Sequence, residues 1–115
     1  MTELEDLRQQ LRAFAAERDW DQFHSPKNLA MALSVEAAEL LELFQWLTEE
    51  QSRTLTPEDH AKVSDEIADV LLYLIQLCDA LGVDPIAAAE RKIIANAGKY
   101  PVEKARGTSR KSTDL

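Results

Sequence analysis

The sequence lacks the residues on which disulfides and soft-metal sites depend. Cys78 is the single cysteine, so no disulfide can form within a monomer, and a reducing compartment fits. His24 and His60 are the only histidines, and neither stands three residues after a glutamate on one helix, which excludes the Glu-x-x-His pattern of di-iron bundles. A metal site in this chain would therefore rest on oxygen ligands.

Glycine, proline and aromatic residues are also scarce. Three glycines, four prolines and 6% aromatic residues interrupt a sequence rich in alanine, leucine and glutamate, which is typical of an all-helical protein. A length of 115 residues is enough for one domain. We expect an all-α domain over residues 1–98 and a basic tail over residues 99–115.

The charge is acidic but unevenly distributed. A net charge of −8 argues against a nucleic-acid polymer or a membrane surface as partner. Residues 99–115 are basic. Such a tail either lies over bound phosphates or is a solvated, partly disordered end, and the sequence alone favours the solvated end. No long apolar run occurs, and the start MTELEDL resembles neither a signal nor a transit peptide, so we expect a cytoplasmic protein.

Capping residues and prolines mark four helices. Ser25, Thr56 and Asp84 each precede a proline, the order of an N-cap and a first-turn residue, and Gly82 is placed to end the third helix. The second and third helices are apolar nearly all round, which favours a homo-oligomer. An antiparallel four-helix bundle is the simplest packing for helices over residues 2–18, 25–48, 56–81 and 84–98.

Two of these helices carry paired acids within apolar runs. Glu36 and Glu39 share a face of the second helix, and Glu66 and Asp69 share a face of the third, because three residues turn a helix by about 300°. A single E-x-x-E is common on solvated helix faces, but two copies among buried leucines need a compensating cation. Oxygen ligands alone suit Mg²⁺, with Mn²⁺ as a substitute.

Aromatic and basic residues accompany the acids. Residues 20–24 lie in a connection where aromatic rings either stack on a nucleotide base or simply pack. Trp46 is expected on the Glu39 side of the second helix, and Tyr73 on the acidic stripe of the third. On the fourth helix, Lys92 and Asn96 either meet phosphate oxygens or are surface contacts.

The segment AERDWDQFHSPKNLAMALSVEAAELLELFQWL, the later DEIADVLLYLI and the ending KYPVEKARGTSRKSTDL resemble the MazG-like all-α nucleotide pyrophosphohydrolases, and among them the dCTP pyrophosphatases. This resemblance implies Mg²⁺-dependent hydrolysis of a deoxynucleoside triphosphate to the monophosphate and pyrophosphate, which clears modified or surplus nucleotides. It also implies a homotetramer built as a pair of dimers. One departure is Leu11, which replaces a base-contacting histidine and weakens the expectation of cytosine preference.

The resemblance assigns roles to residues already identified. The metal ligands and catalytic acids would be Glu36, Glu39, Glu66 and Asp69. The substrate contacts would be Trp20, Phe23, His24, Trp46 and Tyr73, with Lys92 and Asn96 as less specific matches.

Two other functions remain open on the sequence. A different enzyme of the superfamily, such as a dUTPase-like or phosphoribosyl-ATP pyrophosphohydrolase, would keep the acids and change the pocket. A non-enzymatic helical interaction bundle would use the apolar helices for assembly and the acids for solubility. Stabilisation by Mg²⁺ separates a metal enzyme from such a bundle.

Overall fold

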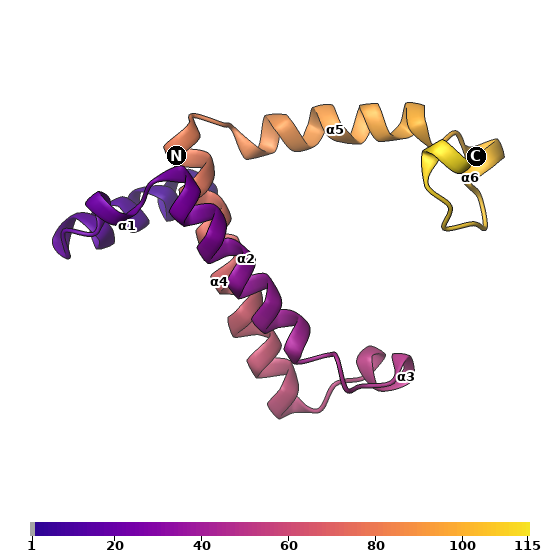
Figure 1. Ribbon diagram of the computed structural model, residues 1–115, viewed down its shortest axis with the longest axis horizontal. Coiled ribbons are helices and arrows are strands. Elements are labelled where there is room, and N and C mark those ends of the chain that lie inside the picture. The colour runs from indigo at the N-terminus through magenta and orange to yellow at the C-terminus, as the bar shows by residue number, and fades with distance from the viewer. Residues whose placement is uncertain (1) are drawn as a thin grey trace. The chain divides into compact units, whose positions relative to one another are not determined.

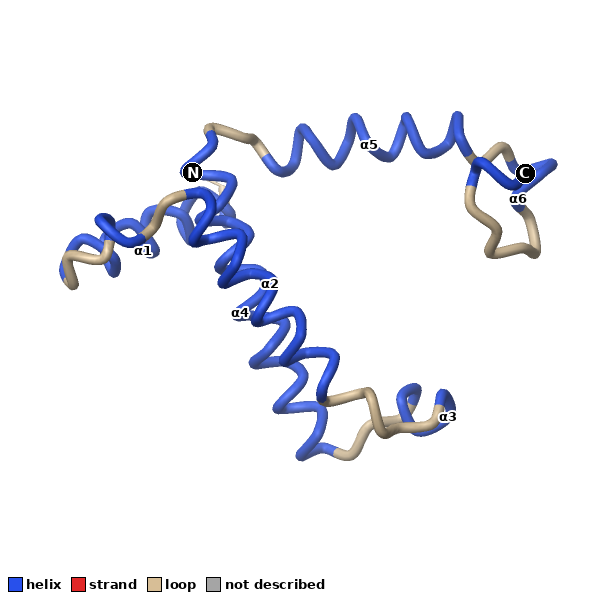
Figure 2. Tube along the Cα trace, viewed as in Figure 1, coloured by secondary structure: helices blue, strands red, loops and turns tan. Residues whose placement is uncertain are grey.

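The computed structural model describes residues 2–115, and every regular element in that range is helical (Figures 1 and 2). The predicted all-α class is confirmed. The chain divides into two compact units, one ending at Gly82 and the other running from Val83 to Leu115. The elements are α1 (Glu3–Glu17), η1 (Asp21–Phe23), α2 (Pro26–Glu42), α3 (Glu49–Arg53), α4 (Pro57–Leu81), α5 (Pro85–Lys99), α6 (Val102–Ala105) and η2 (Ser112–Asp114).

The helix starts follow the predicted capping residues. The Ser25 hydroxyl accepts a hydrogen bond from the Asn28 backbone N–H at 3.2 Å, and Thr56 and Asp84 cap α4 and α5 in the same way. Gly82 ends α4 with φ 67°, a left-handed conformation that costs glycine little. Each N-cap accepts a hydrogen bond from an N–H group that the first turn leaves without a partner, which is worth about 1 kcal/mol, and the Gly82 N–H donates to the Asp79 and Cys78 carbonyls of the last turn of α4.

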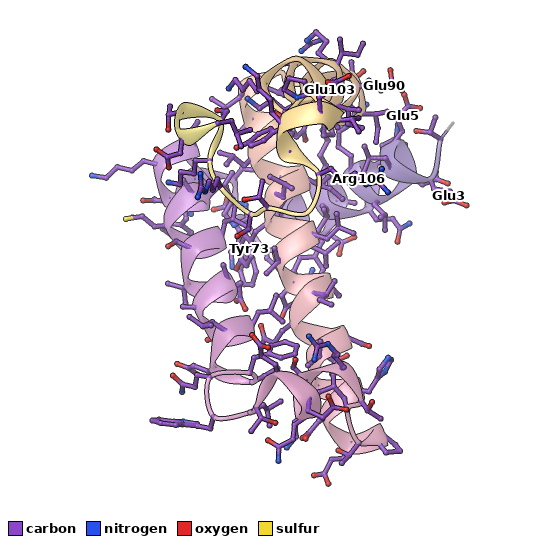
Figure 3. All side chains as sticks on the ribbon, turned by 90° about the vertical axis from the view of Figure 1, so that its right-hand side faces the viewer. Glu3, Glu5, Tyr73, Glu90, Glu103 and Arg106 are labelled. Carbon is purple, nitrogen blue, oxygen red and sulfur yellow. The ribbon has the colours of Figure 1, made fainter. Side chains whose placement is uncertain are left out.

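The first unit is built on an antiparallel pair formed by α2 and α4, which lie side by side in both views (Figures 1 and 3). The α1 helix packs against α4, and Arg12 donates two hydrogen bonds to the Asp79 carboxylate, at 2.7 and 2.5 Å. The core is small. Within residues 2–115, four apolar residues are buried: Ala15, Leu29, Val63 and Ile75. Much apolar surface therefore stays open to solvent in a single chain.

Two predicted boundaries are wrong around the end of α2. The helix was expected to continue to about Thr48 but ends at Glu42, where i→i−3 bonds such as Phe44 N to Leu41 O replace the α-helical pattern. Thr48 is instead the N-cap of α3, in a capping box with Gln51, and its extended backbone is incompatible with the interior of a helix. The segment expected to be a loop thus contains a short helix.

The second unit also differs from expectation. The α5 helix continues through Gly98 to Lys99, and the expected tail contains α6 and η2. Several apolar side chains of this unit are exposed, including Ile93 at 69% and Ile94 at 75%. No single helix within residues 2–115 is long and apolar enough to cross a membrane, and α4 and α5 meet that length and composition only when they are taken together.

Candidate functional site

The acids predicted from the sequence converge between α2 and α4. Glu36 and Glu39 of α2 and Glu66 of α4 each offer a carboxylate oxygen, and these three oxygens lie within 4.8 Å of one another. Asp69, the fourth predicted ligand, lies outside this close group, one helical turn after Glu66. The antiparallel pairing of α2 and α4 therefore brings together acids that are 27 to 30 residues apart in sequence.

The acidic cluster is electrostatically unfavourable as three ionised groups. Partial burial raises the pKa of Glu36 from 4.5 to about 7, and the adjacent carboxyl groups of Glu39 and Glu66 add to the increase. Burial likewise raises the pKa of Glu66. One carboxylate oxygen of Glu36 and one of Glu66 are buried without a hydrogen-bond partner among the described residues. A cation would satisfy both oxygens and remove the repulsion.

The donor set limits which cation fits this cluster. All three groups are carboxylates, and no histidine or cysteine belongs to the group. Hard divalent cations prefer oxygen ligands, whereas softer metals prefer nitrogen and sulfur. The residues present thus fit a hard divalent ion held between α2 and α4.

A cavity of about 440 Å³ lies on α4 beyond the acids and is walled by α1 and by the connection before α2. Trp20 packs edge-to-face on Phe14 at 5.7 Å between ring centroids, and on His24 at 6.2 Å. Tyr73, labelled on α4 in Figure 3, contributes a further aromatic ring. The full lining is Leu7, Gln10, Leu11, Phe14, Trp20, His24, Asp69, Leu72, Tyr73 and Gln76.

Trp20 is placed by the way α1 ends. The Trp20 N–H donates to the Ala15 carbonyl at 2.9 Å, and the Asp19 N–H donates to the Ala16 carbonyl at 3.2 Å, the two bonds of a Schellman motif. Asp19 occupies the left-handed position of this motif with φ 53°. Aspartate tolerates that conformation better than most residues. The chain therefore turns back at this point and directs Trp20 toward Phe14.

The predicted substrate residues divide into those that line the cavity and those that do not. Trp20, His24 and Tyr73 line it, as does Asp69, so the cavity opens beside the acidic cluster. Phe23 is 58% exposed and is absent from the lining, although its carbonyl accepts a hydrogen bond from the Asn28 side chain at 2.9 Å. That bond fixes the connection between α1 and α2.

Three other predicted residues are absent from the lining of this cavity. Trp46 follows the end of α2 rather than lying on its Glu39 face, and it is 87% exposed. Trp20 precedes α2, and 17 helical residues at 1.5 Å each separate the two tryptophans by roughly 25 Å. The two tryptophans therefore do not line one cavity within a single chain, and the expected place of Trp46 on the Glu39 side of α2 is wrong. Lys92 and Asn96 are exposed on α5, in the second unit.

Sequence reasoning missed part of the cavity wall. Leu7, Leu11 and Phe14 recur at helical spacing on α1 and line the cavity, but of these three the sequence connected only Leu11 with the substrate base. Such a stripe has the same spacing whether it covers a core or borders a cavity. The 46% exposure of Phe14 distinguishes the two cases, and the sequence does not contain that information.

The fold and the site define an all-helical protein in which converging carboxylates adjoin an aromatic-lined cavity. Residues 31–115 match the model of the MazG-like family. The dCTP pyrophosphatase 1 of Mus musculus is 46% identical over 114 residues, which cover 97% of this chain and 67% of the mouse protein. The Homo sapiens protein of the same name is 45% identical with the same coverage.

A solved structure agrees with these matches. The crystal structure of a pyrophosphatase from Archaeoglobus fulgidus superposes with a TM-score of 0.82 at 43% identity, covering 88% of this chain and 94% of that one. The chain belongs to the MazG-like family. The predicted family and the predicted enzyme class, a nucleotide pyrophosphohydrolase, are confirmed.

Proposed function

We propose that this protein hydrolyses dCTP, or a related or modified pyrimidine deoxynucleoside triphosphate, to the monophosphate and pyrophosphate. The observation that carries the proposal is the continuity of the two parts of the site. Asp69 stands one turn from Glu66 of the acidic cluster and also lines the aromatic cavity. A ligand with its base among the aromatic rings would place its phosphates at the carboxylates.

The same residues provide a site for Mg²⁺, with Mn²⁺ as a substitute. Glu36, Glu39 and Glu66 would hold the ion, with Asp69 completing the predicted set. When bound, the ion would neutralise the charge on the phosphate oxygens and the charge that develops at the attacked phosphorus. The cluster of acids, with two buried oxygens that lack a partner among the described residues, supports this assignment.

The reaction needs no protein nucleophile. A water molecule attacks the α-phosphorus, the bond to the bridging oxygen of the β-phosphate breaks, and the proton of the water passes to a carboxylate. Glu39 is our candidate for this base. Trp20 and Tyr73 hold the base of the nucleotide, which orients the α-phosphate toward the acids. The products match a role in clearing surplus or modified nucleotides from the cytoplasm.

We also propose that the working form is a homotetramer, a dimer of dimers. A single chain leaves Leu41, Ile67 and Leu71 of the central helices exposed at 63%, 52% and 43%. Burying these surfaces against second copies would complete the four-helix bundle that the sequence predicts. Trp46, Lys92 and Asn96 would then reach a nucleotide in the site of another copy. The division into a domain over residues 1–98 and a tail over 99–115 stays a proposal as well.

The direct test is pyrophosphate release from a panel of deoxynucleoside and nucleoside triphosphates, with Mg²⁺ present or chelated. We expect pyrophosphate and the monophosphate as products, with dCTP or a 5-substituted form as the best substrate. Release of single phosphates, or turnover that persists after chelation, would contradict the proposed chemistry. Light scattering at micromolar concentration tests the assembly, and a monomer mass would refute it.

A further inference from the structure

The cavity next to the acidic cluster has a polar side chain at the end away from the acids. Its walls are mainly apolar or aromatic, and Gln76 is a half-buried amide among the lining residues. Gln76 follows Tyr73 by three residues and Asp69 by seven, so the three side chains form one stripe along α4. The stripe begins at the acids and ends at Gln76.

The orientation of the Gln76 amide follows from one hydrogen bond. Its Nε2 donates to the Leu72 carbonyl oxygen at 3.2 Å. If the amide were reversed, Oε1 would face the Leu72 carbonyl oxygen, and neither atom could donate a hydrogen. The bond therefore assigns Nε2 to the Leu72 side and leaves Oε1 free. The Oε1 atom makes no hydrogen bond within residues 2–115 and remains available as an acceptor.

We propose that Gln76 is a specificity-determining residue, whose Oε1 accepts a hydrogen bond from an exocyclic amino group of the substrate base. This inference rests on the proposed function. Cytosine presents an amino donor at C4, whereas thymine and uracil present an acceptor oxygen there. The Oε1 acceptor therefore favours cytosine. With thymine or uracil, the oxygen at C4 would face Oε1, and no hydrogen bond would form.

The geometry along α4 supports this assignment. Seven helical residues at 1.5 Å each place Gln76 about 10 Å beyond Asp69 along the helix axis. An extended nucleotide has a comparable separation between its α-phosphate and the far edge of its base. Tyr73 lies between the two positions, where a ring can stack.

Other polar groups of the cavity are less suited to this role. Gln10 is exposed on α1, and no bond within the described residues fixes its amide. The His24 ring packs against Trp20. Leu11 offers no polar atom at all. Gln76 is therefore the lining amide that is both partly buried and held in one orientation.

The test removes the amino group from the substrate and the acceptor from the protein. The substrates are dCTP and the triphosphate of the pyrimidin-2-one deoxynucleoside, which lacks only the 4-amino group. The proteins are the wild type and Gln76→Met, in which a side chain of similar length lacks the acceptor. Gln9→Met, on α1 outside the cavity, is the matched control.

We expect loss of the amino group to lower kcat/KM of the wild type about tenfold, the effect of one hydrogen bond at the upper end of its usual range. The control should show the same ratio. Gln76→Met should hydrolyse both substrates with equal kcat/KM, because the partner of the amino group is gone.

If Gln76→Met still hydrolyses dCTP with a higher kcat/KM than the analogue that lacks the amino group, the inference is overturned. It is also overturned if this difference disappears in Gln10→Met and not in Gln76→Met. Gln76→Leu repeats the test if the methionine variant does not fold, and equal rates for both substrates in the wild type refute the inference without any variant. Hydrolysis of both substrates with no Gln76-dependent difference leaves the proposed function intact. A wild type that hydrolyses neither substrate refutes the proposed function, and this inference with it.

Discussion

Replacing Glu36 by glutamine tests the acidic cluster through stability and metal binding together. Glu36 has a pKa of about 7 in the folded protein, against 4.5 for the unperturbed group. A carboxyl group with a raised folded pKa binds more protons when folded, so the free energy of unfolding falls as pH rises from 4.5 through 7. The amide introduced by Glu36→Gln does not ionise, so the variant should lose this part of the pH dependence.

The size of the effect follows from the two pKa values. At about pH 6 the folded carboxyl group is about nine-tenths protonated and the unfolded one is almost fully ionised, so unfolding releases about 0.9 of a proton from this group. At about pH 8 the difference falls to roughly a tenth of a proton. In the absence of metal, the variant should therefore be more stable than the wild type above neutral pH and nearly equal to it in acid.

Differential scanning fluorimetry across this pH range, with and without Mg²⁺, measures both consequences. Mg²⁺ should raise the Tm of the wild type and have little effect on Glu36→Gln, because a ligand that binds only the folded state stabilises it. Glu42→Gln removes a carboxylate from α2 outside the cluster and serves as the control. If Glu36→Gln gains as much Tm from Mg²⁺ as the wild type, Glu36 is not a ligand.

Three further outcomes test the remaining parts of the site and fold. Asp69→Asn should abolish Mg²⁺-dependent pyrophosphate release in a folded protein, and near-normal turnover would remove Asp69 from the ligand set. Trp20→Ala and Trp46→Ala should each raise KM roughly tenfold to a hundredfold with a smaller fall in kcat, since stacking is worth about 1 to 3 kcal/mol per base, and an unchanged KM would exclude that tryptophan from the base pocket. Arg12 lowers the pKa of Asp79, so Arg12→Ala should reduce Tm near neutral pH and have less effect as pH falls through the folded pKa; an equal loss at every pH would contradict this.

Local sequence signals predicted the features that depend on a few neighbouring residues. The caps at Ser25 and Thr56 and the left-handed Gly82 agree with the structure because each is set by chemistry within one helical turn. The pairing of Glu36 with Glu66 was predictable because two consecutive apolar helices bury their apolar faces when they pack antiparallel. The periodic signal gave the correct faces for these acids.

The wrong or missing predictions have two causes. One is that two local sequence signals competed, and the other is that some features depend on contacts between segments that are distant in sequence. Thr48 and Gln51 form the capping box that begins α3, and the apolar periodicity concealed this local signal. Because α2 ends at Glu42, Trp46 does not lie on the Glu39 side of the helix, where it was expected. The wall that Phe14 contributes depends on how α1 packs against α4, which no local pattern of α1 determines.

The structure also explains how one helix can organise both parts of the site. Glu66, Asp69, Tyr73 and Gln76 are spaced by three, four and three residues on α4, so they follow a single stripe from the proposed metal ligands to the proposed base contact. Because α4 is one uninterrupted helix of 25 residues, the spacing between these positions is fixed by helix geometry rather than by loop conformation. If Gln76 contacts the base as we propose, changing it would alter which base is accepted while the acids keep their positions along α4. Substrate choice and hydrolysis would then be separable on the same helix.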